Sequence, residues 1–199
     1  MRILLLYTPR CGSTSILKYF SKVKPDFQCF MDPWFPWAEE NKHVEKIEYG
    51  DIIKKDNIFV KATYKTLPAP IEVMVKDFDK TIFLLRRDIE EQVESSIVAH
   101  REQNFYDTNR RVYKLSSLSD DEYNSMKDKY IFLNNEFINA SLKNNIPLFY
   151  YEDLYYGDFT PLFKELGVDF NLEYFEEYLD ISKRYRDGII KDKSIKTLI

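Results

Sequence analysis

The segment Ile3-Leu4-Leu5-Leu6-Tyr7-Thr8-Pro9-Arg10-Cys11-Gly12-Ser13-Thr14-Ser15 opens on an unbroken apolar run. A run of this kind, from Ile3 to Tyr7, is typical of a strand that is buried on both faces. Polar residues and a glycine interrupt the run, and apolar residues then recur at helical spacing at Ile16, Leu17 and Phe20. The segment therefore predicts a buried strand, a turn and a helix, in the order found in α/β proteins.

The same alternation continues along the chain. Short apolar runs predict further strands over residues 27–31, 58–64, 81–85 and 146–150. Apolar spacing and capping signals predict helices over residues 14–20, 88–103, 119–140 and 160–166, the last ended by Gly167. This pattern predicts a three-layer α/β/α fold around a central, mainly parallel sheet. With 199 residues and no repeat or linker-like segment, the chain is expected to form a single domain over residues 1–199.

Composition narrows the classes of function. The chain has 29 Lys and Arg against 33 Asp and Glu, a net charge of −4 that argues against a general nucleic-acid binder. Its two cysteines, Cys11 and Cys29, cannot form a disulfide framework or a four-ligand zinc site. The first apolar run is too short for a signal peptide or a membrane span, so a cytoplasmic location is expected.

The turn after the first strand has the chemistry of an anion site. A helix that begins near Gly12 would present unpaired N–H groups and the positive end of its dipole, and Arg10 adds a fixed charge. The alternative is a helix that is merely capped by Ser and Thr. The segment lacks the Gly-x-x-x-x-Gly-Lys-Ser/Thr pattern of nucleotide triphosphatases, and Leu17 stands where a cysteine-based phosphatase loop would need arginine. Cys11 is accordingly interpreted as a packing residue rather than a nucleophile.

A second candidate site follows the strand at residues 81–85. Arg86 and Arg87 end that strand, Asp88 begins the next helix, and Ser95 lies two turns into it. Ligands of open α/β sheets bind at the carboxyl ends of the strands, where this arginine pair emerges. The alternative is that Arg87 only pairs with local acids such as Asp88 or Glu91.

Together these segments resemble the sulfotransferase family that uses 3′-phosphoadenosine 5′-phosphosulfate (PAPS). Residues 9–15 are similar to the family's 5′-phosphosulfate loop, and Arg87-Asp88 with Ser95 is similar to its 3′-phosphate site. Residues 59–63, 150–154 and 166–168 are similar to further landmarks, in the family's order. Ile89 departs from the family's proline, and the chain is shorter than typical members.

The resemblance implies a P-loop-like fold and a PAPS-dependent sulfotransferase that moves a sulfuryl group to a hydroxyl or amine and releases 3′-phosphoadenosine 5′-phosphate (PAP). It implies no bound metal. It assigns Arg87 and Ser95 to the 3′-phosphate, and it assigns the phosphosulfate end to the loop residues Arg10, Cys11, Gly12, Ser13, Thr14 and Ser15. Arg10 and the N–H groups of that loop would stabilise the charge of the leaving group.

The acceptor side of the site rests on single residues. Asp32 follows the second strand, where carbohydrate-type members of the family place their base, and it is the candidate general base; the alternative is an ordinary turn aspartate. His43 and His100 are rival bases. Lys61 is expected to reach the phosphosulfate, unless it is a solvent-facing lysine on an edge strand.

The acceptor itself is expected to be a small molecule or a carbohydrate. Trp34, Phe35 and Trp37 are either a platform for it or core residues, and the basic segment 182–188 either closes over the nucleotide or is a solvated terminus. Two other functions remain open: a catalytically silent nucleotide-binding module, and a phosphotransferase with an unusual loop.

Overall fold

The computed structural model describes residues 1–34, 46–101 and 119–175. Within them lies a sheet of five strands, β1 (Arg2–Tyr7), β2 (Gln28–Met31), β3 (Ile58–Thr63), β4 (Lys80–Leu85) and β5 (Leu148–Tyr150). The strand order is β2-β3-β1-β4-β5, and every pairing is parallel. The predicted α/β fold with a parallel central sheet is thereby confirmed.

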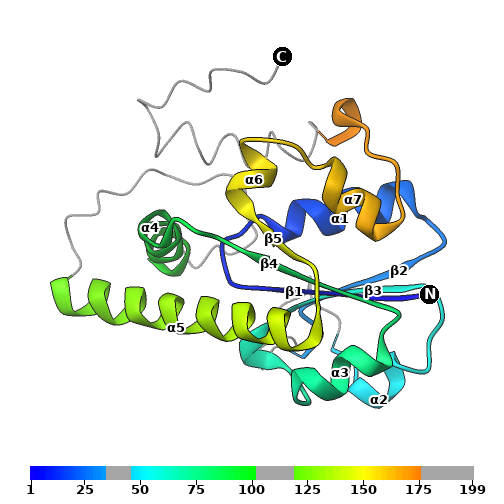
Figure 1. Ribbon diagram of the computed structural model, residues 1–199, viewed down its shortest axis with the longest axis horizontal. Helices are drawn as coiled ribbons and strands as arrows, with labels where there is room; N and C mark the ends of the chain where they lie inside the picture. Colours follow the sequence, from blue (N-terminus) through cyan, green and yellow to red (C-terminus); the bar gives the residue numbers. More distant parts are fainter. Residues whose placement is uncertain (35–45, 102–118, 176–199) are drawn as a thin grey trace.

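Helices cover both faces of this sheet. Figure 1 shows α1 (Ser13–Val23), α6 (Tyr151–Tyr155) and α7 (Thr160–Leu166) on one face, and α2 (Tyr49–Ile52), α3 (Ile71–Asp77) and α5 (Asp120–Asn144) on the other. The short 3-10 helix η1 (Tyr64–Thr66) follows β3. Helix α4 (Ile89–Arg101) lies beyond the carboxyl ends of the strands and packs on α5. The three layers of the predicted architecture are all present.

The core consists of two main clusters, one on each face of the sheet. Along β1, alternate side chains point to opposite faces, so Leu5 and Tyr7 pack with α1, α6 and α7 while Leu4 and Leu6 pack on the side of α3 and α5. A smaller third cluster joins Val93 and Ile97 of α4 to Tyr130 and Leu133 of α5. This third cluster fixes α4 next to the ends of the strands.

The sequence did not reveal three of the helices, α2, α3 and α6. They contain 4, 7 and 5 residues, which leaves little room for an apolar period, and none of them is followed directly by a glycine as the seven-residue α7 is. By contrast, α5 begins at the predicted capping box, in which Ser119 and Glu122 bond to each other's backbone N–H groups. In the described part of the chain, none of the helices combines the length and the hydrophobicity that a membrane span requires.

Candidate active site

The candidate residues gather where the strands end. Parallel strands point in one direction, so the segments after β1, β2, β3 and β4 all emerge at the same edge of the sheet, beside the first turn of α4 (Figure 1). Arg10 to Ser15, Asp32 and Arg87 lie on the segments after β1, β2 and β4, whereas Lys61 lies near the end of β3 and Ser95 on α4.

The loop after β1 has an unusual backbone. Arg10 and Gly12 both have left-handed conformations, with φ of 68° and 78°. Gly12 directly precedes α1, and the Tyr155 hydroxyl donates a hydrogen bond of 2.8 Å to its carbonyl oxygen. No hydrogen bond within the described residues uses the N–H groups of Gly12 or Thr14. The loop therefore presents backbone donors at the positive end of the α1 dipole, which is the chemistry of an anion cradle.

Cys11 lies beneath this loop as a packing residue. Its side chain is fully buried in the cluster on the α1 face, and burial raises the pKa of the Cys11 thiol to about 12. A thiol with this pKa stays protonated at neutral pH and is a poor nucleophile. The interpretation of Cys11 as a packing residue is confirmed.

The two predicted phosphate sites meet directly. The Arg10 Nε donates a hydrogen bond of 3.0 Å to the Ser95 hydroxyl on α4. One turn earlier on α4, the Gln92 amide donates to the Thr8 hydroxyl at 3.0 Å and to the Pro9 carbonyl at 2.6 Å. Arg86 Nη1 donates to the Arg10 carbonyl at 3.2 Å. Helix α4 and the end of β4 thus hold the loop in place, and Arg10 lies against Ser95.

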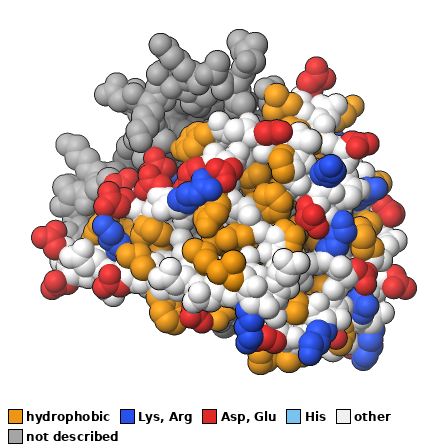
Figure 2. All heavy atoms as spheres, in the orientation of Figure 1, with side chains coloured by type: hydrophobic (Ala, Val, Ile, Leu, Met, Phe, Trp, Pro, Cys, Tyr) orange, Lys and Arg blue, Asp and Glu red, His pale blue; other side chains and the backbone are white. Residues whose placement is uncertain are grey.

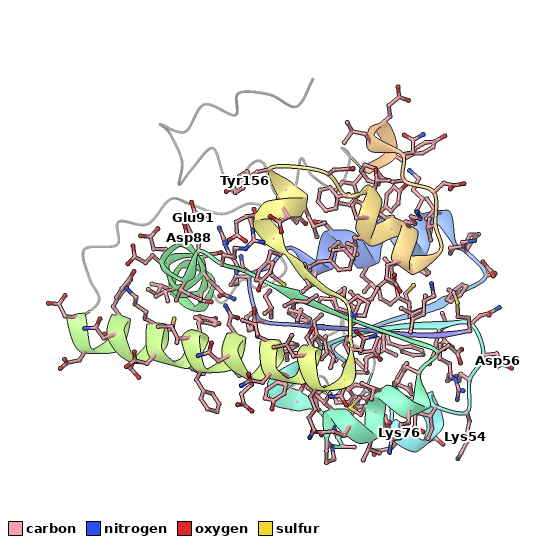
Figure 3. The ribbon with its side chains drawn as sticks, in the orientation of Figure 1. Lys54, Asp56, Lys76, Asp88, Glu91 and Tyr156 are labelled. Carbon is pink, nitrogen blue, oxygen red and sulfur yellow. The ribbon has the colours of Figure 1, made fainter. Side chains whose placement is uncertain are left out.

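The Arg86-Arg87-Asp88 turn is fastened to α6. The Glu152 carboxylate accepts hydrogen bonds from the N–H groups of Arg87 and Asp88, at 3.0 and 2.9 Å, so it holds the turn that leads into α4. The Asp88 carboxylate caps the helix, because it accepts from the Glu91 N–H at 2.9 Å. Figure 3 shows Asp88 and Glu91 at the start of α4, and Tyr156 directly after α6. Figure 2 shows acidic side chains gathered around α4.

Each arginine of this turn has its own acidic partner. The Arg87 guanidinium forms two bonds to the Asp153 carboxylate, at 2.5 and 2.6 Å, and lies 3.9 Å from the centre of the Tyr150 ring. This pairing raises the pKa of Arg87. Arg86 pairs with Glu91. Arg87 therefore does pair with an acid, but the expected partners Asp88 and Glu91 are wrong. Its partner is Asp153 on α6.

A buried ionic cluster lies at the ends of β1, β2 and β3, formed by Tyr7, Asp32 and Lys61. The Lys61 Nζ donates to Asp32 Oδ2 at 2.8 Å and to the Tyr7 hydroxyl oxygen at 3.1 Å. The Tyr7 hydroxyl lies 2.8 Å from both carboxylate oxygens of Asp32 and donates to this carboxylate. The side chains of Lys61 and Asp32 are only 1% and 2% exposed. Each charge at this depth needs the other as its counter-charge, so the loss of either one alone would be costly.

Lys61 is not a surface lysine. Strand β3 lies between β2 and β1, so the alternative of a solvent-facing lysine on an edge strand is wrong. Asp32 has a left-handed backbone, with φ of 49°, and its N–H donates to the Lys61 carbonyl oxygen at 2.7 Å. Asp32 is therefore more than an ordinary turn residue, since its carboxylate pairs with a buried cation.

The remaining candidates divide by location. Trp34 packs against Tyr49, with ring centres 5.7 Å apart, next to the core on the α3 face. Phe35, Trp37, His43 and the segment 182–188 lie outside the described residues, and of His100 the structure describes only its place in α4. In the three described ranges, no group of three His, Cys, Asp or Glu side chains is arranged to hold a metal ion.

Four residues that build the site were given no role from the sequence, although one of them, Glu152, lies in the landmark segment 150–154. Tyr7 was only the end of an apolar run, and Gln92 an ordinary helix residue. Glu152 and Tyr155 contact partners 64 and 143 residues away in the sequence, so local pattern gives no sign of their contacts. Among these contacts, only the one made by Tyr7 could have been expected from the sequence, because a hydroxyl at the carboxyl end of a buried strand needs a hydrogen-bond partner.

Comparison with known proteins bears on the fold. No protein-family model matches the chain, and no curated protein matches it. Among solved structures, the mouse sulfotransferase SULT7A1 complexed with PAP is similar, with a TM-score of 0.55 and 13% sequence identity over 98% of this chain and 72% of that one. At this identity the likeness concerns architecture, and by that measure the chain has a sulfotransferase fold.

Proposed function

We propose that this protein transfers a sulfuryl group from PAPS to a hydroxyl or amine of a small-molecule or carbohydrate acceptor. The observation that carries the proposal is the contact between Arg10 and Ser95, at 3.0 Å. It joins the loop expected to bind the phosphosulfate end to the helix expected to bind the 3′-phosphate. This junction lies at the carboxyl ends of the strands in a fold that a PAP-binding sulfotransferase shares.

The loop residues fit the sulfated end of such a donor. The N–H groups of Gly12 and Thr14 are available as donors, and Ser13 and Ser15 begin the helix whose dipole favours an anion. Cys11 contributes through the backbone, since its thiol is buried. Arg10 supplies the charge that would stabilise the leaving phosphate.

Ser95 and Arg87 are the proposed ligands of the 3′-phosphate. Ser95 is buried beside Arg10, whereas Arg87 is half-exposed and bonded to Asp153. A 3′-phosphate would therefore have to take the place of Asp153 on the guanidinium. Exchange of one anion for another is plausible at an exposed pair, because such pairs contribute little to stability.

Lys61 and Asp32 are the proposed catalytic groups. The Lys61 ammonium lies in the buried cluster on β3, next to the strand that leads into the loop, and its proposed role is to add positive charge where the bond to the leaving group breaks. Asp32 would take the proton of the acceptor. In-line positioning by the loop and removal of this proton are the two demands of the reaction.

Nucleotide binding tests the proposal most directly. We expect calorimetry to show PAP binding at micromolar affinity or better without metal, while ATP binds weakly with or without magnesium. At about 100 times its dissociation constant, PAP should raise the free energy of unfolding by roughly 2.7 kcal/mol.

A transfer assay completes this test. Labelled PAPS is incubated with sugar, phenol and peptide acceptors, and transfer to one class is expected. PAP binding without transfer to any acceptor or to water would indicate a silent binding module. Binding of ATP with magnesium in preference to PAP would indicate a phosphotransferase and contradict the proposal.

A further inference from the structure

The proposed base has no direct access to an acceptor. Both Asp32 carboxylate oxygens lie within 2.8 Å of the Tyr7 hydroxyl, and Lys61 also donates to one of them. Asp32 is 2% exposed and Lys61 1%, whereas Tyr7 is 9% exposed. Tyr7 is thus the most exposed residue of the cluster.

We infer that Tyr7 is a catalytic residue that relays the proton of the acceptor to Asp32. The inference rests on the proposed function and adds to it the group that touches the acceptor. A phenol suits this role, because its oxygen can accept a hydrogen bond while its O–H donates another. In this cluster the O–H already donates to the carboxylate that receives the proton.

On the neighbouring strand β3, one side chain on the same face of the sheet has a hydroxyl that no described residue satisfies. Thr63 is the register partner of Tyr7 on β3, so the two side chains leave the same side of the sheet. Thr63 as a residue is 4% exposed, and its buried hydroxyl has no hydrogen-bond partner within the described residues. Buried hydroxyls rarely lack a partner, so this atom points to a polar ligand beside Tyr7. An acceptor hydroxyl has the donor and acceptor capacity to fill that position.

The acceptor oxygen forms a bond to sulfur, while the bond from sulfur to the bridging oxygen of the donor breaks and PAP leaves with that electron pair. The acceptor proton passes to the Tyr7 oxygen, and the Tyr7 proton passes to the Asp32 carboxylate. Lys61 keeps its protons, and its ammonium, 3.1 Å from the phenol oxygen, stabilises negative charge that develops there. Asp32 later returns its proton through Tyr7 to water.

The test compares Tyr7→Phe, Asp32→Asn and their double variant with the parent protein. Tyr19→Phe is the matched control, because Tyr19 is also a buried, hydrogen-bonded tyrosine but lies on α1 against residues 169–171. Three quantities are measured: the PAP dissociation constant, sulfuryl transfer to the best acceptor of the screen, and sulfate release from PAPS with water as the acceptor.

We expect Tyr7→Phe to lower turnover by about 10²–10⁴-fold, the usual effect of losing a proton-transfer group, with the PAP dissociation constant unchanged. The double variant should be no slower than the slower single variant, because the two residues act as one unit. Tyr19→Phe should turn over like the parent. Retained PAP binding shows that each variant is folded.

Two results would overturn the relay while the proposed function stands. One is near-parental turnover in Tyr7→Phe. The other is a loss of PAP affinity in Tyr7→Phe as large as its loss of turnover, which would make the cluster a binding device. A parent protein that neither binds PAP nor releases sulfate would instead refute the proposed function, and the relay with it.

Discussion

Loss of one partner from the ion pair of Lys61 and Asp32 should destabilise the fold, because the remaining charge cannot reach water. Removing one partner leaves the other buried without a counter-charge, so Asp32→Asn or Lys61→Met alone should lower the free energy of unfolding by about 3–5 kcal/mol. The double variant should recover much of this loss, since it buries no unpaired ion. Urea unfolding of the four proteins measures the coupling between the two sites.

An exposed pair provides the control for this experiment. Lys143 and Glu72 lie 2.9 Å apart, but their side chains are 67% and 48% exposed. Lys143→Ala should therefore leave the unfolding midpoint almost unchanged. If Lys143→Ala destabilised the protein as much as Asp32→Asn or Lys61→Met, the description of Lys61 and Asp32 as a buried ion pair would be contradicted.

Arg87 is the residue on which nucleotide selectivity is expected to depend. Arg87→Ala removes a charge-assisted contact to phosphate, so PAP affinity should fall toward that of 5′-AMP, and discrimination of the 3′-phosphate should collapse. Asp153→Asn is the complementary variant, because it weakens the competing partner and should leave selectivity intact or improve it. Calorimetry with both nucleotides measures the ratio; if Arg87→Ala keeps the parental ratio, Arg87 is structural and Arg86 becomes the candidate.

The loop between β1 and α1 depends on a glycine at position 12. Its φ of 78° strains any other residue, and a Cβ there would collide with the Tyr155 ring. Gly12→Ala should therefore destabilise the protein by about 1–3 kcal/mol and weaken PAP binding, because the loop must move away from α6. Gly50→Ala in α2 is the control: no atom lies within 4 Å of the added carbon, and alanine is the better helix former. Thermal unfolding should move in opposite directions for the two variants; an unchanged midpoint in Gly12→Ala would contradict the account.

At the level of elements, the sequence predicted those strands and helix ends that neighbouring residues determine. The strand from Ile3 to Tyr7, the capping box at Ser119 and the glycine that ends α7 are each determined within a few residues, and all three were predicted. Helix α6 was not, because its five residues are held by contacts elsewhere, such as Glu152 with the start of α4. The orientation of Arg87 toward Asp153 could not be predicted for the same reason, since the two residues are 66 positions apart.

For the whole molecule, the sequence predicted a parallel sheet but not its strand order. That order decides the surroundings of Lys61. A lysine on an edge strand would face water, whereas β3 between β2 and β1 buries it and gives it Asp32 as a partner. The candidate site was therefore predicted as a set of segments, and its central cluster could be found only from the arrangement of the strands.

The central position of β1 also has a consequence for folding during synthesis. This strand is synthesised before the other strands of the sheet, yet its two neighbours are Ile58–Thr63 and Lys80–Leu85. At translation rates of about 5–20 residues per second, roughly 4–16 s separate the end of β1 from the end of β4. Throughout that interval an apolar strand has at least one open edge, which is the template for aggregation. The growing chain therefore carries an unpaired apolar strand while it is still on the ribosome, and shielding of Arg2–Tyr7 there would protect it until β3 and β4 are available.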